Sequence, residues 1–178
     1  LEVGTDARMS QVIAEELGWP QERIAVLSGP NLAMEIAREE PTASVVACSD
    51  IAVAGWIAAA CTAPYFRPYT NTDVIGTEIG GIVKNVIALA VGICEGKQMG
   101  DNTKASVMTR GLAETTRLAV ALGGKTETLF GLSGMGDLIA TCSSSLSRNH
   151  TAGRLLAQGL TLDEVTETMA QTAEGIKS

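Results

Sequence analysis

One stretch, residues 77–96, constrains the fold of this chain more than any other. It is mostly apolar, with a single lysine, Lys84, near its middle. Its β-branched apolar residues recur at helical spacing, at Ile79, Ile82, Val83, Val86, Ile87 and Val91. This spacing predicts a helix that is packed into a core over much of its circumference.

Lys84 does not fit that apolar pattern. Its neighbours three and four places away are glycine or apolar, so no carboxylate of the same helix can pair with it. Gly80 and Gly81 just before it cost the helix ~1 kcal/mol each relative to alanine, which suggests that the space beside them is needed. A desolvated lysine can exchange a proton near neutral pH, as a general acid or base must. The alternative is a lysine whose stem packs while its ammonium reaches water.

Composition excludes several classes of protein. The 178 residues are enough to bury a substantial core. Only 3% of them are aromatic and the net charge is −7. Because nucleic-acid binding usually needs a basic surface or aromatic stacking residues, a nucleic-acid-binding protein is not expected. Any anionic ligand must therefore be held by a local cluster of residues. The four cysteines lack zinc-ligand spacing and suggest reduced thiols. We expect a cytoplasmic protein with no metal site, no signal peptide and no membrane insertion.

The first part of the chain alternates between strand and helix patterns. Strands are expected at residues 23–28, 42–47 and 65–70, the last at a sheet edge because it contains Pro68. Helices are expected at residues 10–17, at 32–40 with Asn31 as its cap, and from about 51 to 61. This order predicts a parallel or mixed α/β sheet, of which residues 1–74 form the latter part.

From residue 77 onward only helical patterns remain, so residues 75–178 are expected to form an all-α domain. A glycine-rich segment at residues 131–137 ends in Asp137, which could cap the following helix or serve a ligand. Residues 143–149 precede a helix that is expected to begin near Thr151. Hydroxyls, an arginine and an amide there could bind phosphate or could simply cap the helix.

Three separated stretches point to one family when they are taken together. They are residues 76–88 around Lys84 and Asn85, residues 109–114, and the segments from Gly134 to Leu138 and from Ser147 to Asn149. They resemble the bacterial NAD(P)-dependent glycerol-3-phosphate dehydrogenases, and Gly29-Pro30 resembles that family's glycine-proline segment. The resemblance runs over essentially the whole chain. It implies the latter part of a Rossmann-type NAD(P)-binding domain, residues 1–74, followed by a helical substrate domain, residues 75–178.

The resemblance also implies an activity and its residues. Members interconvert dihydroxyacetone phosphate and sn-glycerol 3-phosphate with NAD or NADP, for phospholipid synthesis, and we expect a homodimer. Lys84 matches the catalytic acid or base. The positions that match substrate contacts are Gly29, Asn31, Lys84, Asn85, Asp137, Ser147, Arg148 and Asn149. Those that match cofactor contacts are Ala33, Arg148, Thr172 and Glu174.

Some features depart from the family's usual pattern. Asn31 stands where many members have serine or threonine, and Thr172-Ala173 replaces a more usual apolar pair. The glycine-rich dinucleotide turn and a second substrate lysine are expected upstream of Leu1, and the closing helices beyond Ser178. Two alternatives remain, a related lysine-dependent hydroxyacid dehydrogenase and a non-catalytic helical interaction module.

Overall fold

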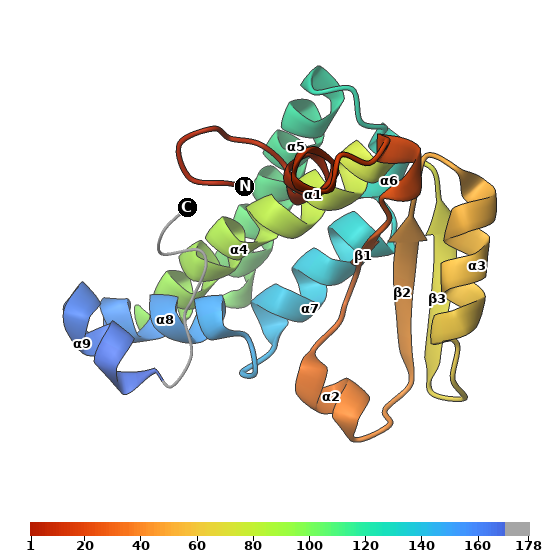
Figure 1. Cartoon of the computed structure of the whole chain (residues 1–178). Coiled ribbons are helices and arrows are strands. Elements are labelled where there is room, and N and C mark those ends of the chain that lie inside the picture. Colours follow the sequence, from red (N-terminus) through yellow and green to blue (C-terminus); the bar gives the residue numbers. More distant parts are fainter. Residues whose placement is uncertain (170–178) are drawn as a thin grey trace.

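The computed structural model describes residues 1–169 as a small sheet joined to a larger set of helices (Figure 1). The sheet part contains α1 (Met9–Leu17), η1 (Gln21–Arg23), β1 (Val26–Ser28), α2 (Ala33–Ala37), β2 (Thr42–Ala47), α3 (Ile51–Cys61) and β3 (Phe66–Asn71). The helical part contains α4 (Val74–Gly96), α5 (Asp101–Ala121), α6 (Thr126–Leu129), η2 (Leu132–Gly136), α7 (Asp137–Ser143), α8 (Arg148–Ala157) and α9 (Leu162–Thr168). The predicted order, α/β followed by all-α, is confirmed.

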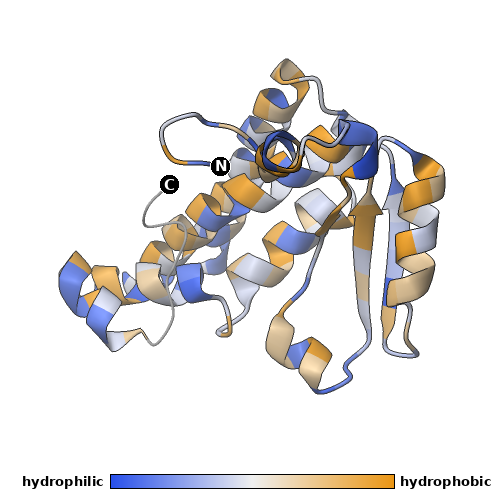
Figure 2. Ribbon diagram, in the orientation of Figure 1, coloured by the Kyte–Doolittle hydropathy of each residue, from blue (hydrophilic) through white to orange (hydrophobic). Residues whose placement is uncertain are grey.

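The three strands form a mixed sheet in the order β1-β2-β3. β1 pairs antiparallel with β2, and β2 pairs parallel with β3. The central strand, β2, has the bounds that its run of apolar residues predicted, and its last four residues are buried. Figure 2 shows β2 and α3 as the most hydrophobic elements of this part, and their core contains Val46, Cys48, Ala54 and Ala58.

Asp50 and Asp73 begin the two helices that follow β2 and β3. The Asp50 carboxylate accepts a hydrogen bond from the N–H of Ala52 at the start of α3, which confirms that end of the predicted helix. The Asp73 carboxylate accepts from Gly76 N–H at the start of α4 and from Lys125 N–H before α6. Asp73 therefore holds the first turn of α4 against a segment 52 residues further along the chain.

The long helix α4 is the axis of the helical part, because α5, α7 and α8 all pack against it (Figure 1). Its buried side includes Ile79, Ile87 and Val91, as the helical spacing predicted, and also Ala88, but Val86 is 44% exposed, against the prediction. Among residues 1–169 it is also the one helix that is long and apolar enough to cross a membrane by length and composition alone. Its buried apolar residues pack against the other helices of the same chain.

Two predicted helix starts were wrong. Asn31 does not cap α2, which has Leu32 at its N-cap position without a side-chain hydrogen bond and is only five residues long. The helix expected near Thr151 begins at Arg148, because the Ser147 hydroxyl accepts a hydrogen bond from His150 N–H and caps it three residues earlier. This shift places Arg148 and Asn149 in the first turn of α8 instead of in the preceding loop.

Candidate functional site

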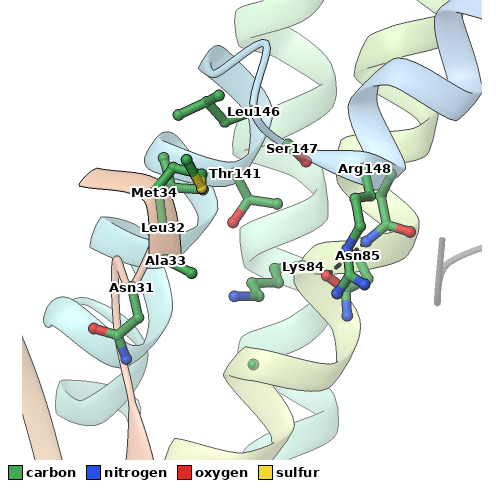
Figure 3. A pocket seen from close by; sticks show the side chains of 12 residues that line it. Asn31, Leu32, Ala33, Met34, Lys84, Asn85, Thr141, Leu146, Ser147 and Arg148 are labelled. Atoms are coloured by element: carbon green, nitrogen blue, oxygen red, sulfur yellow. Dashed lines mark hydrogen bonds between the residues drawn. The ribbon is translucent and has the colours of Figure 1, made fainter. Parts of the chain in front are cut away.

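The residues of the candidate site meet in a cavity of about 490 Å³ between α2, α4, α7 and the start of α8 (Figure 3). Twelve residues line it: Asn31, Leu32, Ala33, Met34, Gly81, Lys84, Asn85, Thr141, Leu146, Ser147, Arg148 and Asn149. Residues from the sheet part thus face residues from the helical part across one cavity. Seven of the twelve are residues that the family resemblance assigned to the site.

Lys84 reaches into this cavity from the middle of α4, with 21% of its side chain exposed. Its ammonium nitrogen lies 2.6 Å from Oδ1 and 2.5 Å from Oδ2 of Asp137, the first residue of α7. The sequence correctly excluded a partner on the same helix, but Lys84 is not unpaired. Its partner is 53 residues away in sequence and is brought to it by packing.

Asp137 does not cap α7. Gly136 occupies the N-cap position, and the Asp137 carboxylate instead accepts hydrogen bonds from Lys84 and from the Thr141 hydroxyl, the latter at 3.2 Å. Burial raises the pKa of Asp137 above its ordinary value of 3.8, and the Lys84 ammonium works in the opposite direction. The Asp137 side chain is 3% exposed and does not line the cavity, so it holds the lysine from behind while the lysine faces the cavity.

Gly80, one of the two glycines before Lys84, is explained by this arrangement. A Cβ at Gly80 would lie 2.4 Å from the carbonyl oxygen of Ser133, so that space is filled by the backbone of η2 and not by a ligand. A Cβ at Gly134 would lie 2.0 Å from the carbonyl oxygen of Leu129. The Gly80 contact holds residues 132–136, a turn of π-helix, against α4, and the Gly134 contact packs the same turn on α6, so that Asp137 lies beside Lys84.

A second polar cluster, formed by Asn85, Arg148 and Asn149, lines the same cavity where α8 begins. The Asn149 amide donates to Asn85 Oδ1 at 3.0 Å, and Arg148 and Asn85 lie beside each other in Figure 3. The first turn of α8 also contributes the positive end of a helix dipole. A guanidinium, two amides and a helix N-terminus suit an anion such as phosphate.

The remaining predicted residues are placed differently. Gly29 does not line the cavity; it has a φ of +135°, which favours glycine, and its Cβ would meet Ser44 Cα at 3.2 Å. It turns the chain from β1 towards Asn31 and Ala33, which do line the cavity. Thr172 and Glu174 lie outside the described residues.

Four lining residues were missed by sequence reasoning: Leu32, Met34, Thr141 and Leu146. Gly81, which the sequence marked as leaving space beside Lys84, does line the cavity. Thr141 had a usable signal, because it follows Asp137 by four places and therefore shares its helix face. Nearby Cys142 is buried, and burial together with Asp137 raises the pKa of its thiol to about 12, so it stays a neutral thiol. The three apolar residues have no distinguishing sequence pattern.

The fold and the cavity define a two-part protein whose sheet and helical portions together enclose a site suited to a small anion. Residues 1–54 match the family model described as NAD-dependent glycerol-3-phosphate dehydrogenase N-terminus, and residues 73–178 match the model described as its C-terminus. The chain belongs to this NAD-dependent glycerol-3-phosphate dehydrogenase family.

Individual relatives agree with this placement. A protein of Thermobifida fusca named glycerol-3-phosphate dehydrogenase [NAD(P)+] is 64% identical over all 178 residues, which are 53% of its own length. One of Streptomyces griseus is 61% identical over the same span. The crystal structure of glycerol-3-phosphate dehydrogenase from Coxiella burnetii matches with a TM-score of 0.89 at 42% identity. The match covers 94% of this chain and 51% of the Coxiella chain. The chain thus spans about half the length of the relatives that it matches.

Proposed function

We propose that the complete enzyme, meaning this chain with any flanking sequence that its gene encodes, interconverts dihydroxyacetone phosphate and sn-glycerol 3-phosphate with NAD(P)H or NAD(P)+. The observation that carries the proposal is the cavity in which Lys84, held by Asp137, stands beside the Asn85, Arg148 and Asn149 cluster. The Lys84 and Asp137 pair suits proton transfer, and the Asn85, Arg148 and Asn149 cluster suits a phosphate. A phosphorylated three-carbon substrate needs both.

Lys84 is the proposed general acid. Its ammonium would give a proton to the oxygen of the substrate's central carbonyl during reduction and remove it from the alcohol in reverse. The ionised Asp137 carboxylate stabilises the ammonium, and Thr141 orients that carboxylate by its hydrogen bond. Because Asp137 is buried behind Lys84, it acts on the substrate only through the lysine.

Arg148, Asn149 and Asn85 are the proposed phosphate contacts. Arginine can meet a phosphate with two parallel hydrogen bonds, and the first turn of α8 adds N–H groups and the helix dipole. The hydroxyl of Ser147 already accepts from His150 N–H, so its proton remains available to donate to a phosphate oxygen. Holding the phosphate would fix the distance between the reacting carbon and Lys84.

The opposite wall of the cavity fits the nicotinamide end of the cofactor. Leu32, Ala33 and Met34 form an apolar wall there, and Asn31 Oδ1 is buried without a hydrogen-bond partner. An amide or a hydroxyl of a ligand would supply the donor that this acceptor lacks. The chemistry supplied by the bound cofactor is hydride transfer. Arg148, Thr172 and Glu174 remain proposed cofactor contacts, the last two by resemblance alone.

Further expectations belong to the same proposal. The domain boundary is proposed at residues 74 and 75, where α4 begins next to its cap, Asp73. The homodimer, the cytoplasmic location and the supply of glycerol 3-phosphate for phospholipid synthesis are also predictions.

The test is the oxidation of NADH and NADPH by the complete enzyme with dihydroxyacetone phosphate, followed by absorbance at 340 nm. Turnover is expected with dihydroxyacetone phosphate, whereas unphosphorylated dihydroxyacetone should be a poor substrate. Reduction of NAD+ or NADP+ by a 2- or 3-hydroxyacid, without dihydroxyacetone phosphate activity, would favour the related dehydrogenase instead. No turnover with any of these would favour the interaction module.

A further inference from the structure

Two helices of the helical part touch through their backbones with no side chain between them. A Cβ added at Gly92 of α4 would lie 2.0 Å from the carbonyl oxygen of His150, and one added at Gly153 of α8 would lie 2.1 Å from the carbonyl oxygen of Leu89. Both neighbours are backbone atoms, which cannot move aside as the tip of a flexible side chain can. Alanine at either position would therefore push α8 away from α4.

This crossing leads directly to the candidate site. Gly153 lies one helical turn beyond Asn149, whose amide joins α8 to Asn85 of α4 at 3.0 Å. Lys84 and Asn85 lie two turns before Gly92 on the same straight element (Figure 1). A shift of α8 at Gly153 must therefore change the separation between the lysine and the residues at the start of α8.

We propose that Gly92 and Gly153 are positioning residues, which set the distance between the proton donor Lys84 and the phosphate contacts Arg148 and Asn149. This inference rests on the proposed function of the same cavity. Glycine in a helix interior is unfavourable unless packing requires it, and the two backbone contacts supply that requirement. A misplacement of about 1 Å at a reacting centre costs on the order of 100-fold in rate, so the contact has a catalytic consequence.

The test compares two substrates in the complete enzyme carrying Gly153→Ala. The kcat/KM for dihydroxyacetone phosphate should fall roughly 10- to 100-fold, whereas that for unphosphorylated dihydroxyacetone should change little, because it makes no phosphate contact. The matched control is Gly111→Ala on α5, whose Cβ would press on the side chain of Ile87, 2.6 Å from its Cδ1 and 2.8 Å from its Cγ1, and not on the backbone of another helix. This control should lower stability and leave the ratio of the two kcat/KM values unchanged.

Several results would overturn the inference. If Gly153→Ala left the ratio of the two kcat/KM values unchanged, whether neither value fell or both fell equally, the glycine contact would affect only folding. If Gly153→Ala does not fold, Gly96→Ala takes its place, because its Cβ would meet the Ala157 Cβ at 2.6 Å at the far end of the same crossing. That variant should lower the ratio by a smaller factor, and no change in the ratio would refute the proposal.

Failure of the proposed function looks different. The unsubstituted enzyme would then lack activity with dihydroxyacetone phosphate, and no ratio could be formed. A crystal structure of Gly153→Ala would still test the geometry, since the inference requires the Asn149 to Asn85 hydrogen bond to be broken or lengthened. Retention of the 3.0 Å separation would contradict it.

Discussion

At the scale of single residues, Arg148 is the side chain whose removal should act most selectively on the substrate. A charge-assisted hydrogen bond contributes roughly 1.5–3 kcal/mol, which corresponds to roughly ten- to a hundredfold in affinity. We therefore expect Arg148→Ala to raise the KM for dihydroxyacetone phosphate by about that factor or more, and Arg148→Lys to recover part of it, since lysine offers a point charge without the planar fork.

The control for Arg148 is the unphosphorylated substrate in the same steady-state assay. Its already poor rate should hardly change, because it has no phosphate to lose. If both substrates lost the same factor, Arg148 would be acting on the cofactor or on the fold, and its assignment to the phosphate would be wrong.

The burial of Asp137 gives the enzyme a predicted acid limb. Its carboxyl has a pKa raised above 3.8 by burial, so as the pH falls it is protonated earlier than an exposed aspartate. Protonation removes the negative partner of Lys84, and kcat should fall below that raised pKa. We expect Asp137→Asn to lower kcat at neutral pH and to abolish this limb in a pH profile.

Asp101→Asn is the matched control for Asp137. Asp101 pairs with Lys104 at 2.7 Å, but its side chain is 96% exposed. This substitution should leave the pH profile of kcat as it is. An acid limb that persisted unchanged in Asp137→Asn would mean that another group titrates, and the proposed link between Asp137 and Lys84 would not hold.

At the scale of elements, Glu78 fastens α1 to α4. Its carboxylate accepts from Arg8 Nη1 at 2.5 Å, from Ser10 N–H at 2.8 Å and from the Ser10 hydroxyl at 2.7 Å. Removal of one partner from a buried pair costs about 3–5 kcal/mol because the other charge is left uncompensated. Glu78→Ala should lower the free energy of unfolding by about that amount, measured by urea denaturation with circular dichroism.

A surface pair provides the comparison for Glu78. Glu40 pairs with Arg38 at 2.9 Å, and both side chains are about half exposed, so Glu40→Ala should change the free energy of unfolding by roughly 0–1 kcal/mol. If the two variants were equally stable, Glu78 would not be fastening α1 to the helical part.

The elements also show where sequence reasoning succeeds. The strand at Thr42–Ala47 and the helix from Ile51 were predictable because their signals are local, an apolar run and an aspartate cap. The start of α8 was missed because Ser147 competes with other serines and Asn149 as a cap, and only tertiary packing decides among them. Asn31 was wrong as a cap because α2 begins one residue later than predicted, with Leu32 at its N-cap position.

At the scale of the whole molecule, the sequence predicted the residues of the candidate site better than the tertiary contacts between them. Lys84, Asn85, Arg148 and Asn149 were identified by resemblance and do share one cavity. The Lys84 to Asp137 pair joins residues 53 places apart, and the close contacts of Gly80 and Gly92 are with backbone from distant segments. No periodicity reports such contacts, because they depend on how the helices pack.

The central claim is that Lys84 donates the proton to the substrate. The most direct measurement is the single-turnover rate of NADH oxidation by the complete enzyme at saturating dihydroxyacetone phosphate, with Lys84→Ala and Lys84→Met compared. Loss of a general acid costs ~10²–10⁴-fold in rate, so both variants should fall by that range. Added ethylammonium should restore part of the rate in Lys84→Ala, where the side-chain space is open, and not in Lys84→Met, where it is filled. Near-normal turnover of either variant without the added amine would contradict the account.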